Sequence, residues 1–290
     1  MINHVADRPQ QAIAELIDKA SQHLQIQSDT PLLDAEVLLC HCLDKTRSFL
    51  RAWPEHQPSQ EQLKHFWALI DERHRGVPVA HLTGHREFWS RDFVVNANVL
   101  IPRPDSELLV ELALARLAPD ASTKIIDLGT GSGALAITIA LERPLANVLA
   151  SDRSASALDV AHLNATRLGA NNVTFVTSDW FEDIAATDFD MVLSNPPYIA
   201  ADDRHLQQGD VRFEPRSALI SAEQGLSDIN TLARQSRSHL KPGGHLLIEH
   251  GYDQRQAVQQ IFKHYGYRQT TTHNDLSGNP RVTSGLWSPS

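Results

Sequence analysis

Apolar residues recur at helical spacing through the first 75 residues of the chain. Three runs repeat every three or four positions, and they comprise Ile13, Leu16, Ile17 and Ala20, then Leu33, Val37, Leu38 and Leu39, then Leu63, Phe66, Leu69 and Ile70. Pro31 suits the first turn of the second helix, and Ser59 with Gln62 fits a capping box at the start of the third. We therefore predict a small all-helical domain over residues 1–75.

The pattern changes to alternating, β-rich residues between positions 76 and 104. Gly84 is a turn signal, and residues 88–89 and 93–95 are rich in aromatic and β-branched side chains. This combination predicts a β-hairpin that links two domains over residues 76–104.

Short apolar runs alternate with helical patterns from Lys124 onward. The runs that predict strands are residues 125–128, 148–151, 173–176, 191–194 and 246–249. Strands separated by helices of about 10–15 residues form a doubly wound, mostly parallel sheet. Residues 267–272 and 281–287 have only a turn between them, which predicts an antiparallel terminal hairpin at one edge. We therefore predict an α/β domain of Rossmann-like type over residues 105–290.

A glycine-rich segment follows the first of these strands and runs directly into a helical pattern. It begins at Asp127 and continues as Gly129, Thr130, Gly131, Ser132 and Gly133. Glycines allow the backbone to turn sharply and to approach a ligand, and parallel sheets bind ligands at the carboxyl ends of their strands. The position predicts a binding site. Because the spacing also satisfies the loose dinucleotide fingerprint, it leaves the ligand open.

An acidic residue, Asp152, ends the second strand about 20 residues after the glycines. A carboxylate at this place can accept both hydroxyls of an adenosine ribose. The same side chain could also cap the helix that begins near Ser154, and the two roles are not exclusive. Asp152 thus favours an adenosine ligand without separating NAD from S-adenosylmethionine.

The fourth strand ends in the segment Asn195, Pro196, Pro197 and Tyr198. Two consecutive prolines cannot continue a central strand, so the backbone must leave the sheet as a rigid loop. Asn195 Oδ1 and the Pro196 carbonyl oxygen are then two acceptors for a planar NH2 group, and the Tyr198 ring can cover its face. The segment predicts recognition of an amide or amine nitrogen.

Charge argues against a nucleic-acid partner. The chain has 26 Lys and Arg against 35 Asp and Glu, a net charge of −9. Residues 1–90 carry nine basic and twelve acidic residues, and the remainder 17 and 23, so neither part is basic. A protein that binds duplex nucleic acid usually presents a clustered basic face. We therefore expect no direct contact with nucleic acid.

Cysteine usage and the apolar pattern indicate a cytoplasmic protein. Cys40 and Cys42 are the only two cysteines, which gives no disulfide framework. With His41 they could suggest a metal site, but consecutive helical positions point in different directions, so we expect no metal. Residues 1–9 lack a signal-peptide pattern, and no stretch approaches about 18 apolar residues. We expect no membrane association, and a monomer.

Several motifs of the sequence together resemble a known family. The glycine segment and the Asn195–Tyr198 segment together resemble class I S-adenosylmethionine-dependent methyltransferases that act on amino groups. Residues 78–84, 100–107 and 213–219 are similar to the release factor glutamine methyltransferases, the HemK/PrmC family. Ser106 stands where that family usually has threonine, which keeps the hydroxyl.

The resemblance implies a substrate, a cofactor and a set of site residues. The substrate would be the glutamine amide in the Gly-Gly-Gln motif of class 1 peptide chain release factors, and the helical domain would help to grip it. S-adenosylmethionine would bind at a set comprising Asp127, Gly129, Thr130, Gly131, Ser132, Gly133, Asp152, Trp180 and Asn195. The glutamine would bind at Asn195, Pro196, Pro197 and Tyr198. Two further features are open apart from the resemblance. Arg103, between two prolines, either positions the substrate loop or pairs with a carboxylate, and the segment from Glu214 to Arg216 is either part of a lid over the site or a structural ion pair.

Four alternatives remain open at this stage. The same motifs would serve an enzyme that methylates a glutamine of a large-subunit ribosomal protein, or an adenine-N6 methyltransferase. The glycine segment alone would also serve an NAD-dependent oxidoreductase. A non-catalytic module that binds translation factors would need the helical domain but not the acceptors at Asn195 and Pro196.

Overall fold

A computed structural model describes residues 11–289, which form two compact units. The first unit contains the described residues up to Gly84 together with Gln208–Phe213, and the second contains His85–Gln207 and Glu214 onward. Residues 76–84 of the expected linker thus fall in the first unit and its hairpin in the second. Residues 1–9, which show no signal-peptide pattern, lie outside the described part. Within that part no helix is long and apolar enough to cross a membrane.

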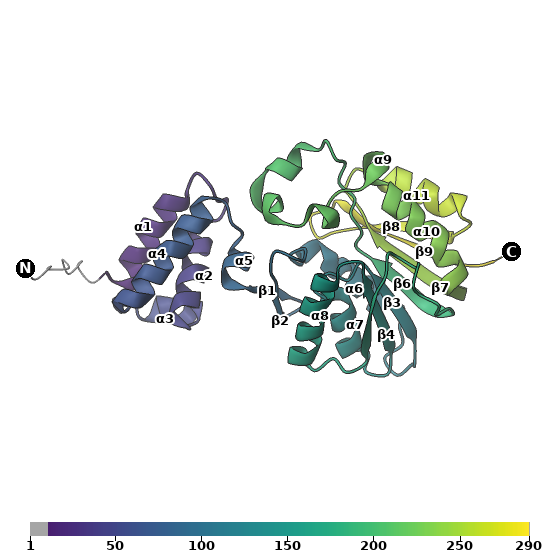
Figure 1. Cartoon of the computed structure of the whole chain (residues 1–290), viewed down its shortest axis with the longest axis horizontal. Helices are drawn as coiled ribbons and strands as arrows, with labels where there is room; N and C mark the ends of the chain where they lie inside the picture. The colour runs from purple at the N-terminus through teal and green to yellow at the C-terminus, as the bar shows by residue number, and fades with distance from the viewer. Residues whose placement is uncertain (1–10, 290) are drawn as a thin grey trace, which may run out of the picture. The chain divides into compact units, whose positions relative to one another are not determined.

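The first unit is helical, as the apolar spacing predicts. Its helices are α1 (Ile13–Leu24), α2 (Pro31–Leu43), α3 (Arg47–Ala52), α4 (Gln60–His74) and α5 (Val79–Thr83) (Figure 1). Leu16, Leu38 and Phe66 are fully buried among them. The capping box is confirmed: Gln62 N donates to Ser59 Oγ at 3.2 Å, and Ser59 N donates to Gln62 Oε1 at 2.9 Å.

A short piece of distant sequence completes this unit, a feature that periodicity could not predict. The 3₁₀ helix η3 (Gly209–Phe213) joins the helices through Arg73 of α4. Arg73 Nε donates to Asp34 Oδ2 at 2.7 Å and Arg73 Nη1 donates to Asp210 Oδ1 at 2.8 Å. Because Arg73 and Asp34 are buried, each compensates the charge of the other.

The second unit begins with the predicted hairpin, β1 (His85–Phe88) and β2 (Arg91–Val94). The buried Asn164 of α8 (Ala155–Leu168) fastens β2. Its Oδ1 accepts from Val94 N at 2.8 Å, and its Nδ2 donates to the carbonyl oxygens of Val94 and Ser132. The hairpin is therefore tied to the glycine segment that begins the next βα unit. It leads through the 3₁₀ helix η1 (Pro104–Ser106) into α6 (Glu107–Leu114).

A seven-stranded sheet forms the centre of the second unit, with strand order β5-β4-β3-β6-β7-β9-β8. The strands are β3 (Lys124–Leu128), β4 (Asn147–Asp152), β5 (Val173–Thr177), β6 (Phe189–Ser194), β7 (Leu240–Glu249), β8 (Arg268–Asn274) and β9 (Pro280–Leu286). β3 to β7 are parallel, and β8 and β9 pair antiparallel at one edge. The predicted mostly parallel sheet with an antiparallel terminal hairpin is confirmed.

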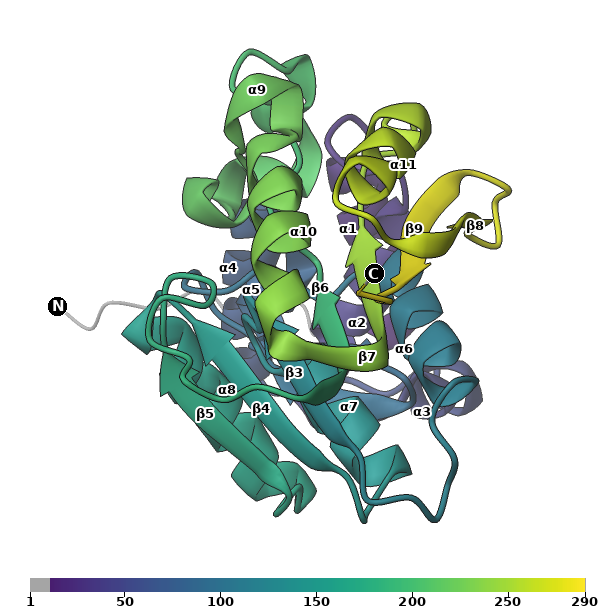
Figure 2. The ribbon, with the colours of Figure 1, turned by 90° about the vertical axis from the view of Figure 1, so that its right-hand side faces the viewer.

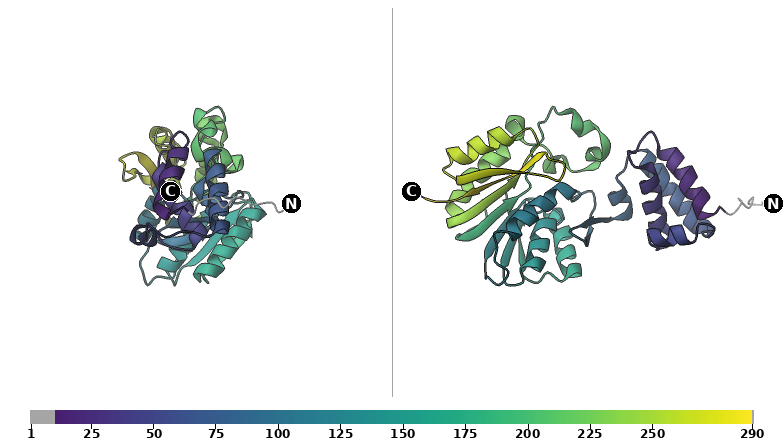
Figure 3. Two further views of the ribbon diagram at one scale, coloured as in Figure 1. Left: turned by 90° about the vertical axis from the view of Figure 1, so that its left-hand side faces the viewer. Right: turned by 180° about the vertical axis from the view of Figure 1, so that it is seen from behind.

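Helices cover both faces of this sheet (Figures 2 and 3). α6, α7 (Ala134–Glu142) and α8 pack on one face, and α10 (Ser227–His239) and α11 (Arg255–His264) pack on the other. Successive residues of β3 serve the two layers, since Ile125 is buried on the first face and Ile126 on the second. Burial on both faces explains the continuous apolar runs of these strands.

Candidate active site

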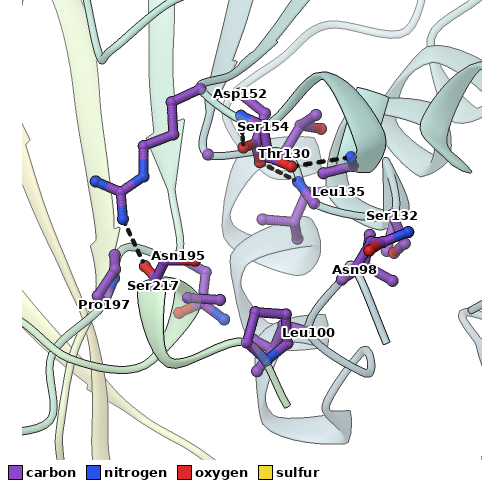
Figure 4. Close-up of a pocket in the computed structure, with 18 of the residues that line it drawn as sticks. Asn98, Leu100, Thr130, Ser132, Leu135, Asp152, Ser154, Asn195, Pro197 and Ser217 are labelled. Atoms are coloured by element: carbon purple, nitrogen blue, oxygen red, sulfur yellow. Dashed lines mark hydrogen bonds between the residues drawn. The ribbon is translucent and has the colours of Figure 1, made fainter. Parts of the chain in front are cut away.

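A cavity of about 340 Å³ opens within the second unit where β3, β4 and β6 end. These three strands are neighbours in the sheet, so their carboxyl ends meet at one edge. Its volume lies in the range of about 300–1,000 Å³ that is usual for small-molecule sites. The predicted residues that line it are Arg103, Gly129, Thr130, Gly131, Ser132, Asp152, Trp180, Asn195 and Pro197 (Figure 4).

The glycine segment forms one wall of the cavity. Gly129 N and Thr130 N donate to the Ser151 carbonyl oxygen of β4 at 2.8 and 2.9 Å, which holds the loop against the neighbouring strand. Gly133 has φ +83°, and a Cβ there would lie 2.6 Å from Ile137 Cδ1. A side chain would therefore be both strained and sterically blocked at this position.

Asp127 supports this loop through a buried hydrogen bond and does not line the cavity. It is fully buried, and its Oδ2 accepts from Thr130 Oγ1 at 2.7 Å. Burial raises the pKa of Asp127 to about 7, while the Thr130 hydrogen bond lowers it. Asp127 and Gly133 are thus placed to shape the loop, whereas the other seven residues expected at the cofactor line the cavity.

Asp152 ends β4 and faces the loop. Its Oδ2 accepts from Gly131 N and its Oδ1 accepts from Ser154 N, both at 2.9 Å. Each oxygen keeps a second lone pair for a ligand hydroxyl. The second role, as helix cap, is wrong, because Ser154 caps α8 by accepting from Ala157 N at 3.2 Å.

Trp180 closes the cavity against the first glycine. Its backbone has φ +50°, and its indole Cζ3 lies 3.4 Å from where a Cβ on Gly129 would be. Ser178 Oγ donates to the Trp180 carbonyl oxygen at 2.9 Å and supports this unusual conformation. A bulky residue held in the left-handed region is a form of strain that occurs mainly at functional sites.

The Asn195–Tyr198 segment leaves the sheet at the end of β6. Asn195 Nδ2 donates to Ser106 Oγ at 3.1 Å, so Asn195 Oδ1 stays available as an acceptor. Pro197 lines the cavity, but Pro196 and Tyr198 do not. The half-buried Tyr198 ring packs against the apolar layer that includes residues of α10 and α11, and its hydroxyl donates to Glu249 Oε1 at 3.4 Å.

Gln254 connects the segment at Tyr198 to α9 (Ala222–Gly225). Gln254 Nε2 donates to the Tyr198 carbonyl oxygen at 3.0 Å and to the Gln224 carbonyl oxygen at 3.2 Å. Within α9, Glu223, Gln224 and Gly225 all have positive φ, so this turn is not a regular right-handed helix.

Arg103 both lines the cavity and pairs with a carboxylate. Its guanidinium contacts Glu214, whose Oε1 also accepts from Ile101 N at 3.0 Å. Glu214 is buried, whereas the Arg103 side chain is about 30% exposed and can still reach a ligand. The two roles left open for Arg103 in the sequence are therefore compatible.

A second contact joins two residues that line the cavity. Arg153 Nη2 donates to the Ser217 carbonyl oxygen at 3.1 Å (Figure 4). Arg153 follows the strand β4, and Ser217 lies in η4 (Arg216–Ala218). Both residues line the cavity, although no motif in the sequence marks either as a site residue. The position of Arg153 next to Asp152 is the signal that could have found it.

Comparison with known proteins agrees with this geometry. The PrmC N-terminal domain matches residues 15–84, and the methyltransferase small domain matches residues 104–211. A release factor glutamine methyltransferase of Shewanella oneidensis is 45% identical over 278 residues, which are 96% of this chain and 97% of that protein. One from Escherichia coli is 48% identical over 260 residues, 90% of this chain and 94% of that protein. The chain belongs to the release factor glutamine methyltransferase family.

Solved structures show the same methyltransferase fold. A methyltransferase from Pyrococcus furiosus superposes with a TM-score of 0.52 at 15% identity, covering 77% of this chain and 98% of its own. This likeness supports the fold alone. The predicted fold class and the resemblance to the release factor glutamine methyltransferase family are both confirmed, and the chain is a methyltransferase.

Proposed function

We propose that this protein transfers the methyl group of S-adenosylmethionine to the side-chain amide nitrogen of the glutamine in the Gly-Gly-Gln motif of class 1 peptide chain release factors. The observation that carries the proposal is the Asn195 amide at the cavity. Because its nitrogen is engaged by Ser106, its oxygen is the acceptor left for a substrate N–H. Membership of the release factor glutamine methyltransferase family supports the choice of substrate.

The residues present fit S-adenosylmethionine as the cofactor. The loop from Gly129 to Gly133 lets a ligand approach the backbone closely, Asp152 has free lone pairs for ribose hydroxyls, and Trp180 offers an aromatic surface. When bound, S-adenosylmethionine supplies an electrophilic methyl group on a sulfonium. A T. thermophilus 16S rRNA methyltransferase in complex with AdoMet and guanosine has the same fold, with a TM-score of 0.50 at 16% identity over 70% of this chain and 49% of its own.

The chain's own contribution is placement. A carboxamide nitrogen is a weak nucleophile because its lone pair is delocalised into the carbonyl group, so alignment with the methyl group matters most. The proposal assigns one N–H bond to Asn195 Oδ1 and the other to the Pro196 carbonyl oxygen, although of these two residues only Asn195 lines the cavity. Accepting these N–H bonds favours the positive charge that develops on nitrogen. We assign no dedicated general base, because an N-alkylated amide cation is acidic enough to lose its proton to water.

The remaining roles follow from position. The half-buried Tyr198 holds the Pro196–Pro197 loop to the core, and Arg103 orients the substrate loop. The helical unit contributes to binding of the release factor. The enzyme acts as a monomer in the cytoplasm and does not contact nucleic acid.

The test uses methyl-labelled S-adenosylmethionine and three acceptors offered separately. These are an unmodified class 1 release factor, large-subunit ribosomal proteins and adenine-containing nucleic acid. Label in the release factor supports the proposal. Label only in ribosomal protein or nucleic acid contradicts it, and binding of release factor without any transfer would indicate a non-catalytic module.

Asp152→Asn is expected to weaken S-adenosylmethionine binding about 10- to 100-fold, which corresponds to losing a satisfied polar contact. An amide cannot accept from both Gly131 N and Ser154 N and still present two acceptors to a ribose. Titration calorimetry measures the change. Asp159→Asn, an exposed carboxylate of α8, is the matched control and should bind like the wild type. Equal affinity for S-adenosylmethionine in both variants would show that Asp152 does not bind the cofactor.

Arg153→Ala is expected to release the cofactor product about two- to tenfold faster, since one exposed hydrogen bond contributes about 0.5–1.5 kcal/mol. The loss of the Ser217 contact removes a hydrogen bond between two residues that line the cavity. Stopped-flow displacement of S-adenosylhomocysteine measures the rate. The exposed Arg255 of α11 provides the control variant Arg255→Ala. An unchanged rate for Arg153→Ala would show that the contact does not restrain the ligand.

A further inference from the structure

Glu249 is a buried carboxyl group behind the active site that the mechanism above does not use. It ends β7, the strand next to β6 in the sheet, and the register pairs Ile248 with Ser194. The residues that follow this pair, Glu249 and Asn195, therefore lie at the same edge of the sheet. Glu249 is only 1% exposed and does not line the cavity.

Two side chains connect Glu249 to the amide-binding loop. The Tyr198 hydroxyl donates to Glu249 Oε1 at 3.4 Å. The other oxygen, Glu249 Oε2, is buried without a hydrogen-bond partner among the described residues, and the neighbouring Ser106 side chain lowers the pKa of the carboxyl group. Ser106 also lines the cavity and accepts from Asn195 Nδ2 at 3.1 Å. The carboxyl group thus lies at one end of a chain that leads through Ser106 to Asn195.

The Ser106 hydroxyl group determines the direction of these hydrogen bonds. A serine hydroxyl has one proton to donate and two lone pairs to accept with. When its proton points to a carboxylate, only lone pairs face Asn195, so Asn195 must present its NH2 group to Ser106. The amide oxygen of Asn195 then takes the opposite orientation, which is the one needed to accept a substrate N–H.

We propose that Glu249 is a positioning residue whose carboxylate, acting through the Ser106 hydroxyl, directs the Asn195 amide oxygen toward the substrate nitrogen. This inference rests on the proposed function, because it assumes that Asn195 accepts an N–H of the glutamine amide. It assigns roles to two groups that do not react. Ser106 transmits the orientation, and Glu249 determines it.

Protonation of Glu249 would reverse the direction of the hydrogen bonds that lead from Glu249 through Ser106 to Asn195. A protonated carboxyl group can donate to Ser106, and the Ser106 proton can then turn to Asn195. The Asn195 amide would then rotate so that its oxygen faces Ser106 and its NH2 group faces the cavity. An NH2 group cannot accept an N–H. The substrate amide would meet a donor where it needs an acceptor, so turnover requires the carboxylate form.

The surroundings of Glu249 place this change in an accessible pH range. Burial raises the pKa of Glu249 to about 7, against the opposing effects of the Ser106 side chain and of the Arg281 charge. Asp105 of η1 also raises this pKa, although Arg281 of β9 pairs with Asp105 at 3.1 Å and so partly offsets it. Tyr198 is the other titratable group in contact. Because the carboxylate is lost as the pH falls through about 7, kcat should fall on the acid side.

The experiment compares pH profiles of kcat from about pH 6 to about pH 8.5 for the wild type, Glu249→Gln, Ser106→Ala and Ser106→Thr. We expect an acid limb in the wild type and none in Glu249→Gln, which cannot ionise. Ser106→Ala should lower kcat about 10- to 100-fold at the upper pH, and KM for the release factor should change little. Ser106→Thr keeps the hydroxyl and should retain both the rate and the acid limb.

Two controls separate this role from a structural one. Ser236→Ala removes a buried hydroxyl of α10 that does not line the cavity, and it should leave kcat and its pH profile unchanged. S-adenosylmethionine affinity is measured over the same pH range, because burial also raises the pKa of Asp127 to about 7 beneath the cofactor loop. Titration of Asp127 would change cofactor affinity and would persist in Glu249→Gln.

The inference is overturned by an acid limb that survives in Glu249→Gln, by a flat wild-type profile, or by wild-type kcat in Ser106→Ala. Failure of the proposed function has a different result, since the wild type would then transfer no methyl group to release factor at any pH. Thermal unfolding of each variant is recorded beside kcat. Restoration of activity in Ser106→Thr shows that the hydroxyl, and not the fold at this position, is what Ser106→Ala removes.

Discussion

Replacing Asn195 by alanine is expected to lower kcat for release factor methylation by about 100- to 1,000-fold, the usual cost of removing one preorganised polar contact to the transition state. Asn195 Oδ1 is the acceptor that remains after Ser106 engages the amide nitrogen. Without it the substrate amide loses one of two groups that orient it and stabilise its developing charge. Steady-state kinetics with a saturating release factor measures the change.

The control for this variant is Asn171→Ala, which removes an exposed asparagine outside the cavity. It should keep wild-type turnover. S-adenosylmethionine binding is measured in both proteins, so that a loss of turnover can be assigned to the methyl-transfer step. Near-wild-type turnover in Asn195→Ala with cofactor binding intact would disprove its role.

Gly225→Ala is expected to destabilise the methyltransferase unit by about 2–4 kcal/mol and to lower activity as well. Gly225 has φ +85°, and a Cβ there would lie 2.0 Å from the Tyr198 carbonyl oxygen and 2.7 Å from Gln254 Nε2. The strain of alanine at positive φ contributes about 1 kcal/mol and the overpacking about 1–3 kcal/mol. Because the clash is with the backbone of Tyr198, the Pro196–Pro197 loop must shift. Urea unfolding and kcat measure the two effects.

A matched glycine separates strain from clash. Gly243 also has φ +85°, but a Cβ there would meet no atom within 4 Å. Gly243→Ala should therefore lose only about 1 kcal/mol and keep its activity. If Gly225→Ala and Gly243→Ala behaved alike, the close approach of Gly225 to Tyr198 would not matter for the site.

The parts of the fold that the sequence predicts are those with a local signal. The apolar runs of β3 and β6 predict buried parallel strands, and glycines and prolines mark where these strands end. Because the carboxyl ends of neighbouring parallel strands meet, Gly129 and Asn195 could be assigned to one site without a structure.

The parts that the sequence does not predict depend on contacts between distant residues. No pattern near Asp210 indicates that η3 joins the helical unit through Arg73, 137 positions away in the sequence. The contact of Arg153 with Ser217 and the link from Asn195 through Ser106 to Glu249 are of the same kind. Such pairings depend on where the folded sheet brings loops together, and single residues carry no sign of them.

The central claim is that the methyl group reaches the side-chain amide nitrogen of one glutamine. The most direct measurement incubates the protein with S-adenosylmethionine and an unmodified class 1 release factor, digests the product and sequences its peptides by mass spectrometry. The account predicts one added methyl group on the glutamine of the Gly-Gly-Gln motif, and none in a release factor with alanine at that position. A methyl group on another residue, or equal labelling of the alanine variant, would contradict it.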